Sequence, residues 1–515
     1  MSGRSRAGQQ PGHDAGREPV HDAGHDADHG TGHHDVVVIG GGPGGYATAF
    51  RAAARGMDVA LVEEAEVGGV CLHRGCIPSK AVLHVARVLE EASRAEVLGL
   101  RLQIDGIDGD GLDAFRAGVI RRLHRGLDHL ATARTTRYHG RGRLVAATTP
   151  DPAADHAHLE VQVMAADGST TGLVAPQVVI ATGSRPRLLD AVPVDGEVVQ
   201  TSDQALWFTT PPERAVIIGA GAIGVEFASM WAPMGTHVTL VEALDRVLPL
   251  EDTDSSAALT SAYRGRGIEV LTSALVRGAS RNGGSVELDV EVDGEPRTLT
   301  ADRVLVAVGR VPNTAEVGLD DLGVLDGRGA VVTDAWGATE VPGLWAVGDV
   351  RPTLALAHAA FAEGLVVGDR IAGREDVTPV DHTHTPRVTY SHPEVASVGL
   401  TEDEAVERFG RDRVVATTTS LQGNAKAIIA GSDGQVKVVH LADEAPVGAP
   451  GDGGPVLGVH VVGPQATELI AAATLATTWD AVPEELAAIA HVHPSLSEAI
   501  GETYLAAVGL PLHGG

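Results

Sequence analysis

Cys71 and Cys76 are the only cysteines among the 515 residues, and they stand five positions apart. Two thiols at this spacing could form a disulfide that accepts and returns electron pairs. A purely structural bridge over so short a loop would stabilise little, because the loop-closure entropy that a disulfide removes grows with loop length. Two other interpretations stay open from the spacing alone, ordinary buried thiols and a metal site completed by His73. The metal site is the poorer one, and we expect none, because no second ligand pair follows at metal spacing.

The spacing also makes a geometric demand on the chain. Five residues of regular helix would hold the two α-carbons roughly 8 to 9 Å apart, which is beyond the reach of a disulfide. The turn that carries Cys71 and Cys76 must therefore depart from a helix when the pair is oxidised. Lys80 lies one helical turn beyond Cys76 if a helix resumes there, and a solvated helix charge is the alternative interpretation for it.

An imidazole and a carboxylate near the C-terminus could supply the proton chemistry that such a disulfide needs. His493 and Glu498 stand five positions apart, and a carboxylate can orient an imidazole and hold the proton that it takes up near neutral pH. A helix-end role is the alternative for Glu498, because Ser495-Leu496-Ser497-Glu498 is a capping box. We expect His493 rather than the nearby His491 to be the base, because only His493 directly precedes the Pro-Ser-Leu-Ser-Glu run.

The elements upstream of the cysteines predict a nucleotide-binding unit. The apolar run 36–39 leads into the glycine turn 40–45, a helical stretch at 46–55 and a second apolar run, 59–62, that ends in Glu63. Glycines in this βαβ pattern let the backbone approach a pyrophosphate closely, the helix N-terminus attracts its charge, and the carboxylate holds a ribose hydroxyl.

A second copy of the same pattern follows. Residues 215–218 lead into Gly219, Gly221 and Gly224, a helical stretch to residue 230 and the run 238–241 before Glu242. The first glycine and the acidic residue are 23 positions apart in both copies. Two matched copies predict two bound nucleotides.

Glu242 also favours one nucleotide over another. A carboxylate at the end of this strand can accept a hydrogen bond from a 2′-hydroxyl but would repel a 2′-phosphate. The second nucleotide should therefore be NAD rather than NADP, although the nearby Arg246 weakens this inference.

Three further buried-strand patterns stop at a glycine, as a chain does when it leaves a sheet beside a ligand. They span residues 178–184, 304–310 and 344–349, and the last ends in Asp349. An Asp after a Gly at a strand end is also a common turn former. These segments contribute further candidate cofactor-binding residues, which are Thr182, Gly183, Gly309, Arg310, Gly348 and Asp349.

Composition narrows the class of protein. With 43% hydrophobic residues the chain can bury large cores, and a formal net charge of −29 argues against binding nucleic acid through its phosphates. No uncharged apolar run reaches the length of about 18 residues that a membrane span needs, and the N-terminus lacks the apolar core of a signal peptide. We expect a cytoplasmic protein. A disulfide there is more often redox-active than structural.

The first 34 residues have a different composition from the rest. They carry six histidines among Gly, Asp and Ala, with almost no large apolar side chains. We expect a disordered, solvated tail. Metal binding through imidazole and carboxylate groups is the alternative.

The motifs together resemble the pyridine nucleotide-disulfide oxidoreductases and, among them, the dihydrolipoamide dehydrogenases that serve as E3 component of 2-oxoacid dehydrogenase complexes. The resemblance spans about residues 35–513 and includes the runs 356–364, 393–399 and 493–498. It implies an α/β fold with two Rossmann-like dinucleotide-binding domains, for FAD and for NAD, and a C-terminal α+β dimerisation domain. The implied boundaries are 1–34 for the tail, 35–183 and 309–384 for the FAD domain, 184–308 for the NAD domain and 385–515 for the dimerisation domain.

The resemblance also implies roles for single residues. Cys71 would exchange with substrate while Cys76 faces the flavin, and Lys80 would lie by the flavin N5, paired with Glu226. His493, oriented by Glu498, would take the proton of a dihydrolipoamide thiol. Glu63 would hold the adenosine ribose of FAD and Asp349 its ribityl chain. The full set of expected cofactor-binding residues is Gly40, Gly42, Pro43, Gly45, Glu63, Lys80, Thr182, Gly183, Gly219, Gly221, Gly224, Glu242, Gly309, Arg310, Gly348, Asp349, Ala357 and His358.

Expected partners follow from the same resemblance. They are a second copy of the chain, whose C-terminal domain completes the active site, and a lipoyl domain or E2 of a 2-oxoacid dehydrogenase complex, or a lipoylated H protein. Another FAD-dependent NAD(P)H disulfide or quinone reductase is the alternative function. Mercuric reductases normally add a C-terminal cysteine pair, which this chain lacks, and glutathione reductase would want basic residues where Glu242 stands. A redox-silent structural subunit would have no reason to retain the whole catalytic set.

The chain departs from the usual family pattern at four positions. Val70, His73 and Arg74 replace the commonest residues around the cysteines, and Ser495 stands where Thr is usual. None of these changes removes a chemical group that the disulfide exchange needs.

Overall fold

The computed structural model describes residues 31–148, 158–442 and 454–513. Almost all of the expected N-terminal tail therefore lies outside the described residues. The sequence boundary at residue 34 differs slightly from the structure, because β1 (Gly32–His33) already pairs in parallel with Leu173 and Val174.

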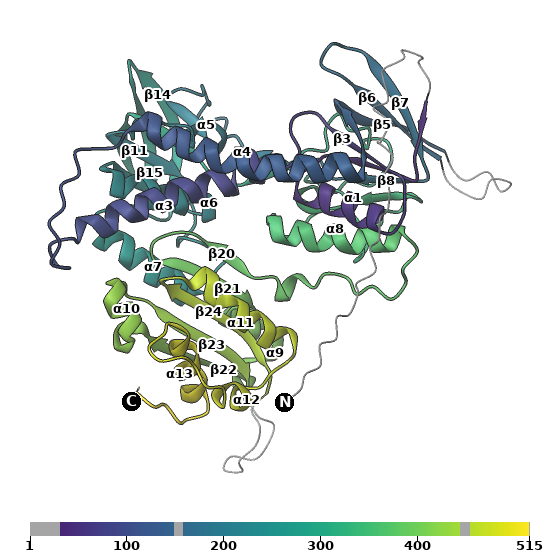
Figure 1. Cartoon of the computed structure of the whole chain (residues 1–515). Helices are drawn as coiled ribbons and strands as arrows, with labels where there is room; N and C mark the ends of the chain where they lie inside the picture. Colours follow the sequence, from purple (N-terminus) through teal and green to yellow (C-terminus); the bar gives the residue numbers. More distant parts are fainter. Residues whose placement is uncertain (1–30, 149–157, 443–453, 514–515) are drawn as a thin grey trace, which may run out of the picture.

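The first nucleotide unit forms a five-stranded parallel sheet with the order β19-β8-β2-β3-β4. Its central strands β2 (Val36–Ile39) and β3 (Val59–Glu63) are the two expected apolar runs, and β8 (Gln177–Ile180), β19 (Leu344–Ala346) and β4 (Thr136–His139) complete the sheet. Helix α1 (Pro43–Ala54) packs closely on α8 (Ala357–Ile371), as Figure 1 shows. The helix begins at Pro43, three residues earlier than the sequence predicted, because proline suits the first helical turn.

A four-stranded sheet covers part of this domain, in the order β1-β7-β6-β5. Strands β5 (Arg141–Thr148), β6 (His158–Met164) and β7 (Thr170–Ala175) form an antiparallel meander. Its inward residues, such as Leu159 and Leu173, share one core with Val37 and Ile39 of β2. The meander therefore closes one face of the parallel sheet.

The second nucleotide unit repeats the parallel architecture, with the strand order β10-β17-β11-β12-β13. Strands β11 (Arg214–Ile218) and β12 (His237–Val241) flank α6 (Ala222–Trp231), as in the first copy. Strands β17 (Arg303–Val306), β10 (Val199–Thr201) and β13 (Glu269–Leu271) complete the sheet, with β10 and β13 at its edges. Helix α7 (Thr253–Gly265) lies between β12 and β13 in the sequence. A second meander, β14 (Ala274–Asn282), β15 (Ser285–Val292) and β16 (Glu295–Ala301), lies beside the sheet.

Two short strands mark the crossings between the nucleotide domains. The chain leaves the first domain through β9 (Ser184–Pro186) and returns through β18 (Arg310–Pro312), and the two pair antiparallel. Both therefore lie close together beside the ends of β8 and β17.

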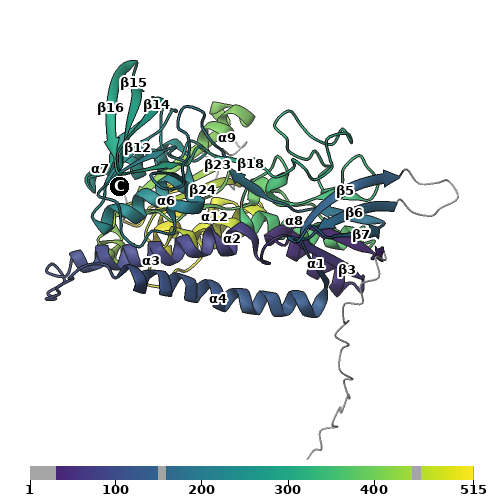
Figure 2. The same cartoon turned by 90° about the horizontal axis from the view of Figure 1, so that it is seen from above.

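Two long helices join the domains. Helix α3 (Cys76–Ser93) and α4 (Gly109–Arg134) lie side by side, and Figures 1 and 2 both show them running from the first domain to the second. Helix α3 also packs on α6. This contact brings the segment after the cysteines against the second nucleotide unit.

The C-terminal domain is built on an antiparallel sheet with the order β20-β21-β24-β23-β22. Its strands are β20 (Arg387–Thr389), β21 (Glu394–Gly399), β22 (Val414–Ser420), β23 (Gln435–Leu441) and β24 (Val456–Gly463). Helices α11 (Ala466–Thr478) and α13 (Ser497–Ala507) pack on this sheet, with the short α12 (Pro483–Ala487) against α13. The expected fold class, two Rossmann-like domains followed by an α+β domain, is confirmed.

Candidate active site

The two cysteines lie on either side of a break between helices. Helix α2 (Gly69–His73) carries Cys71 and ends at His73, and α3 begins at Cys76. Arg74 and Gly75 between them leave the helical region, with φ/ψ of −139°/5° and −134°/−109°. This is the departure from regular helix that a disulfide between Cys71 and Cys76 requires.

The two thiols differ in acidity. Both are free in the structure. A hydrogen bond from Cys71, helped by the positive charge of Lys80 and opposed by burial, lowers the pKa of Cys76 to about 7. That hydrogen bond and burial raise the pKa of Cys71. In the reduced pair these shifts favour the negative charge on Cys76 over Cys71.

Lys80 and Glu226 form an ion pair across the two nucleotide domains. The Lys80 Nζ lies 2.9 Å from each Glu226 carboxylate oxygen, and it also lies 4.5 Å from the centre of the Tyr390 ring. Burial acts to lower the pKa of Lys80, but Glu226 outweighs it and raises that pKa. Lys80 is thus a paired cation beside the thiols, which argues against the alternative that it is only a solvated charge on the surface of a helix.

Both acidic strand ends also hold their own glycine turns. Glu63 accepts hydrogen bonds from the Gly41 and Ala65 amides at 2.6 and 2.9 Å. Glu242 accepts from the Ala220 and Leu244 amides at the same two distances. The two copies therefore match in detail, and each carboxylate fixes the backbone of its turn. The sequence pattern predicted the carboxylates but not this second role.

The glycines of the second turn divide into two kinds. A Cβ on Gly224 would lie 1.9 Å from the Gly219 carbonyl oxygen, so this position needs glycine for packing. A Cβ on Gly221 would meet no protein atom within 4 Å, and its φ of −71° suits any residue. In the first turn a Cβ on Gly45 would lie 1.8 Å from the Gly40 carbonyl oxygen, whereas one on Gly42 would meet only the Gly69 Cα at 4.0 Å. The open side of Gly42 and Gly221 leaves room for a pyrophosphate at the start of the helix, so the residues fit two dinucleotides.

Asp349 lies in a polar chain at the ends of the first sheet. Ser184 donates to Asp349 Oδ2 at 2.5 Å, and Arg310 donates to the Ser184 hydroxyl and carbonyl, at 2.6 Å in each case. Thr182, two residues before Ser184, donates to the Asn313 carbonyl at 2.6 Å. The three segments that stop at a glycine are therefore brought together here. Ser184, which links Asp349 to Arg310, was not among the residues expected from the sequence.

Glu363 is a second residue that sequence reasoning missed. Its carboxylate is 1% exposed and accepts from the Gly348 amide at 2.6 Å, while Arg351 and His382 lie 3.0 and 3.1 Å away. Burial acts to raise the pKa of Glu363, but these partners hold it below its usual value. The buried anion anchors the turn that carries Asp349. Glu363 lies in the run 356–364, and nothing in that run distinguishes its carboxylate from a surface charge.

Ala357 and His358 open α8. The His358 Nε2 lies 2.7 Å from the Pro386 carbonyl oxygen, in the segment that leads into β20. The imidazole therefore ties the first domain to the C-terminal domain. Ala357 is the first residue of the helix.

His493 and Glu498 are brought together as expected. The His493 Nδ1 lies 2.8 Å from Glu498 Oε1, and Glu498 Oε2 accepts from the Ser495 amide at 2.6 Å. The backbone hydrogen bond from Ser495 and the bond from His493 lower the pKa of Glu498. The Glu498 carboxylate therefore serves both roles that the sequence offered as alternatives: it binds a backbone amide at the helix end and it orients the imidazole. His491, by contrast, packs over Gly501 of α13.

Metal sites and membrane-spanning helices can be looked for only within the described residues. Among residues 31–148, 158–442 and 454–513, no group of three His, Cys, Asp or Glu side chains is placed to hold a metal ion. The helices of these same ranges include none that is long and apolar enough to cross a membrane. The histidines of the N-terminal tail that precede residue 31 lie outside the described residues.

Two dinucleotide-binding domains, a thiol pair at their junction and a C-terminal antiparallel domain define a disulfide oxidoreductase that uses two nucleotides. Residues 34–364 match the family model described as pyridine nucleotide-disulphide oxidoreductase, and residues 385–504 match the dimerisation domain of that family. The chain belongs to this family. It is a flavoprotein oxidoreductase with FAD and NAD as cofactors, and it forms a homodimer.

Similar proteins cover nearly the whole chain. The dihydrolipoyl dehydrogenase of Bacillus subtilis (strain 168) is 38% identical over 485 residues, which are 93% of this chain and 99% of that protein. The dihydrolipoyl dehydrogenase of Corynebacterium glutamicum is 38% identical over 477 residues, covering 91% and 97%. The crystal structure of LpdA from Mycobacterium tuberculosis matches with a TM-score of 0.81 and 28% identity, and the match covers 93% of this chain and 100% of that one.

Proposed function

We propose that this enzyme oxidises protein-bound dihydrolipoamide to lipoamide and reduces NAD⁺ to NADH. The observation that carries the proposal is the uneven thiol pair, in which Cys76 holds the charge and Cys71 the proton, together with the His493–Glu498 pair that could serve as its base. The names of the relatives at 38% identity support the dithiol substrate.

The proton chemistry follows from these residues. His493 of the partner subunit takes the proton from one dihydrolipoamide thiol, and Glu498 stabilises the resulting imidazolium. The substrate thiolate attacks the Cys71 sulfur, the bond between Cys71 and Cys76 breaks, and Cys76 leaves as a thiolate. The second substrate sulfur then attacks the first. The bond from the substrate to Cys71 breaks, and the proton of the second thiol passes to Cys71.

The remaining residues serve the cofactors. FAD, when bound, would supply the two-electron redox chemistry that links the dithiol to NAD⁺. Lys80 holds a positive charge at this junction, and Glu226 keeps it in place. Glu63 and Glu242 each hold a glycine turn and would accept a hydrogen bond from a ribose hydroxyl, and the charge of Glu242 would disfavour a 2′-phosphate.

The dithiol carrier is proposed to be a separate lipoylated protein. A lipoyl domain or E2 of a 2-oxoacid dehydrogenase complex, or a lipoylated H protein, would present the substrate to the dimer. We place the reaction in the cytoplasm, where two free cysteines in a long chain can cycle through a catalytic disulfide without structural bridges.

A steady-state comparison tests the proposal. We expect turnover with dihydrolipoamide and NAD⁺, and much weaker turnover with glutathione, quinones or NADP⁺. The purified protein should be yellow, and one equivalent of dithiol should produce a long-wavelength absorbance from thiolate next to flavin. Cys71→Ser is the control that should abolish dithiol turnover while leaving the protein yellow. Turnover confined to glutathione with NADPH, or to quinones, would refute the proposed substrate.

A further inference from the structure

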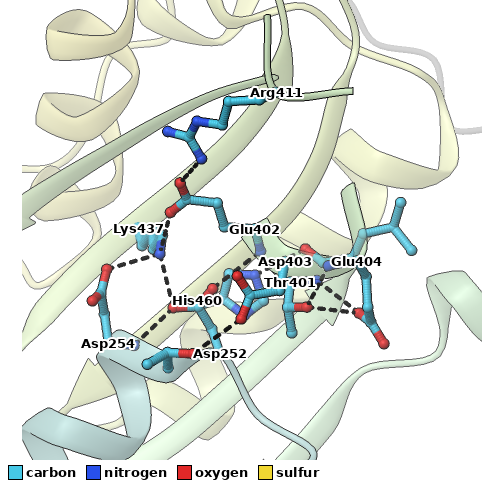
Figure 3. Close-up of polar contacts among 11 residues, drawn as sticks. Asp252, Asp254, Thr401, Glu402, Asp403, Glu404, Arg411, Lys437 and His460 are labelled. Carbon is cyan, nitrogen blue, oxygen red and sulfur yellow. Dashed lines mark hydrogen bonds and ion pairs between the residues drawn. The ribbon is translucent and has the colours of Figure 1, made fainter. Parts of the chain in front are cut away.

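A buried cluster of charges joins the C-terminal domain to the second nucleotide domain. The Lys437 Nζ, on β23, lies 2.9 Å from Asp252 and 2.8 Å from Asp254, which precede and open α7. It also lies 2.8 Å from Glu402 at the start of α9 (Glu402–Phe409), and Figure 3 shows the three carboxylates converging on it. The side chains of Lys437 and Asp252 are only 4% and 2% exposed.

The charges of this cluster hold each other in place. Burial acts to lower the pKa of Lys437, but hydrogen bonds to Asp254, Glu402 and Asp252 outweigh it and raise that pKa. Arg411 lies on the far side of Glu402 and contributes a second positive charge. A buried ion pair contributes little net stability compared with apolar packing, but breaking one leaves a costly unpaired charge. Its main effect is therefore to fix the position of the segments that it joins.

Glu251, the residue before Asp252, is also bound by the C-terminal domain. Arg387 of β20 donates to Glu251 Oε1 at 3.1 Å, and Ser397 of β21 donates to Glu251 Oε2. The Glu402 amide donates to Asp252 Oδ2 at 3.1 Å. Residues 251 and 252 of the nucleotide domain are thus bound by three elements of the C-terminal domain in addition to β23.

The same segment reaches the nucleotide turn. Glu251 donates its amide to the Leu248 carbonyl at 2.8 Å, and Leu248 donates its own amide to the Ala220 carbonyl at 2.8 Å. Ala220 lies between Gly219 and Gly221. Leu248 has a φ of 45°, an unfavourable left-handed conformation for a residue with a side chain, which persists only where the surroundings determine it.

The first nucleotide unit contains the matching contact. The Gly68 amide donates to the Gly41 carbonyl at 2.8 Å, and Gly41 occupies the place in its turn that Ala220 occupies in the second. In the first unit the segment behind this contact leads to Cys71. In the second unit it leads to Asp252 and the charge cluster. Both turns are therefore fixed from outside by the segment that follows the acidic strand end.

We propose that Lys437 is a positioning residue for NAD, because it holds residues 244–252 from the dimerisation domain so that Leu248 fixes the glycine turn at 219–221. The proposal rests on NAD as the nucleotide of the second unit and not on the identity of the dithiol. Removing the lysine charge loosens the turn and weakens nucleotide binding, while the thiol pair and the flavin site keep their geometry.

The test measures nucleotide binding to the oxidised, FAD-containing dimer without any dithiol. Lys437→Met should raise the dissociation constant for NADH, measured by calorimetric titration, by about tenfold, the scale of coupling within one charge network. The KM for NAD⁺ should rise in parallel, while kcat at saturating NAD⁺, the KM for dihydrolipoamide and the flavin spectrum stay near the wild-type values. Arg297→Met is the matched control, because it breaks an exposed ion pair with Glu269 in the same domain and should leave NADH binding unchanged.

A second variant covers the case in which the buried lysine cannot be replaced without unfolding. Asp254→Asn removes one partner whose side chain is 50% exposed, and it should shift the NADH dissociation constant in the same direction by a smaller factor at nearly unchanged Tm. The proposal is overturned if folded variants bind NADH within about twofold of the wild type, or if NADH and dihydrolipoamide affinities fall equally. A wild-type enzyme that binds NADH but does not turn over dihydrolipoamide would refute the proposed substrate alone.

Discussion

His493 Nδ1 lies 2.8 Å from Glu498 Oε1 although the His493 side chain is 81% exposed. Glu498 is itself fixed by the Ser495 amide, so the carboxylate orients the imidazole before any partner arrives. With Nδ1 held by Glu498, the Nε2 atom faces outward. An oriented but exposed imidazole is what a base shared between subunits requires.

Replacing either residue should reduce dithiol oxidation. We expect His493→Gln to lower kcat with dihydrolipoamide by roughly 10²- to 10⁴-fold, the usual contribution of a general base. Glu498→Gln should cost less, at least about tenfold, because the imidazole remains but loses its orientation and the stabilisation of its charge. The measurement is steady-state NADH formation.

Oxidation of NADH by ferricyanide is the control for both variants, because it needs the cofactor sites but no thiol base. It should stay near the wild-type rate. An equal loss in both assays would mean that His493 and Glu498 support the fold and not the proton transfer.

Complementation between subunits tests where His493 acts. Homodimers of Cys71→Ser and of His493→Gln should each be inactive with dihydrolipoamide. Co-expressed chains should recover about one quarter of the wild-type activity, because half of the random dimers are mixed and each mixed dimer has one complete site across its two-fold axis. No recovery in purified mixed dimers would place the base and the disulfide in the same subunit.

Sequence patterns were sufficient where the physical constraint is local. The sequence predicted both nucleotide units, at 36–63 and 215–242, because the residues of the strand, the glycine turn and the acidic strand end all act within one βαβ unit. The break between Cys71 and Cys76 followed from disulfide reach. Contacts between distant segments left no such pattern: Glu226 could be assigned to Lys80 only through the family resemblance.

Other residues could not be found from the sequence for the same reason. Glu363 serves Asp349 through the Gly348 amide, and Lys437 gathers carboxylates at 252, 254 and 402. A buried charge looks like any surface charge until its partners are placed around it. Such partners come from separate elements, and only the fold determines which of them meet.

A pair of glycine substitutions separates packing from ligand space in the second turn. Gly224→Ala places a Cβ against the Gly219 carbonyl oxygen and should destabilise the domain by about 1–3 kcal/mol, as overpacking does. Gly221→Ala meets no protein atom within 4 Å and should keep the wild-type Tm. It should raise the NADH dissociation constant about tenfold, which corresponds to roughly 1.4 kcal/mol. Thermal unfolding and NADH titration of both variants check this, and a Gly221→Ala enzyme with unchanged affinity would refute the assigned pyrophosphate position.

The charge on Cys76 should titrate near neutral pH. Because its pKa is lowered to about 7, the thiolate of the reduced enzyme persists above that pH and is lost as the pH falls through it. The loss of the thiolate is measured by following the long-wavelength absorbance of the dithiol-reduced holoenzyme during a titration from alkaline to acidic pH. Cys71→Ala removes the hydrogen bond that lowers this pKa most, so the midpoint should move to higher pH. Cys71→Ser keeps a hydroxyl donor and should stay closer to the wild type, and equal midpoints in the Ala variant and the wild type would show that Cys71 does not hold the thiolate.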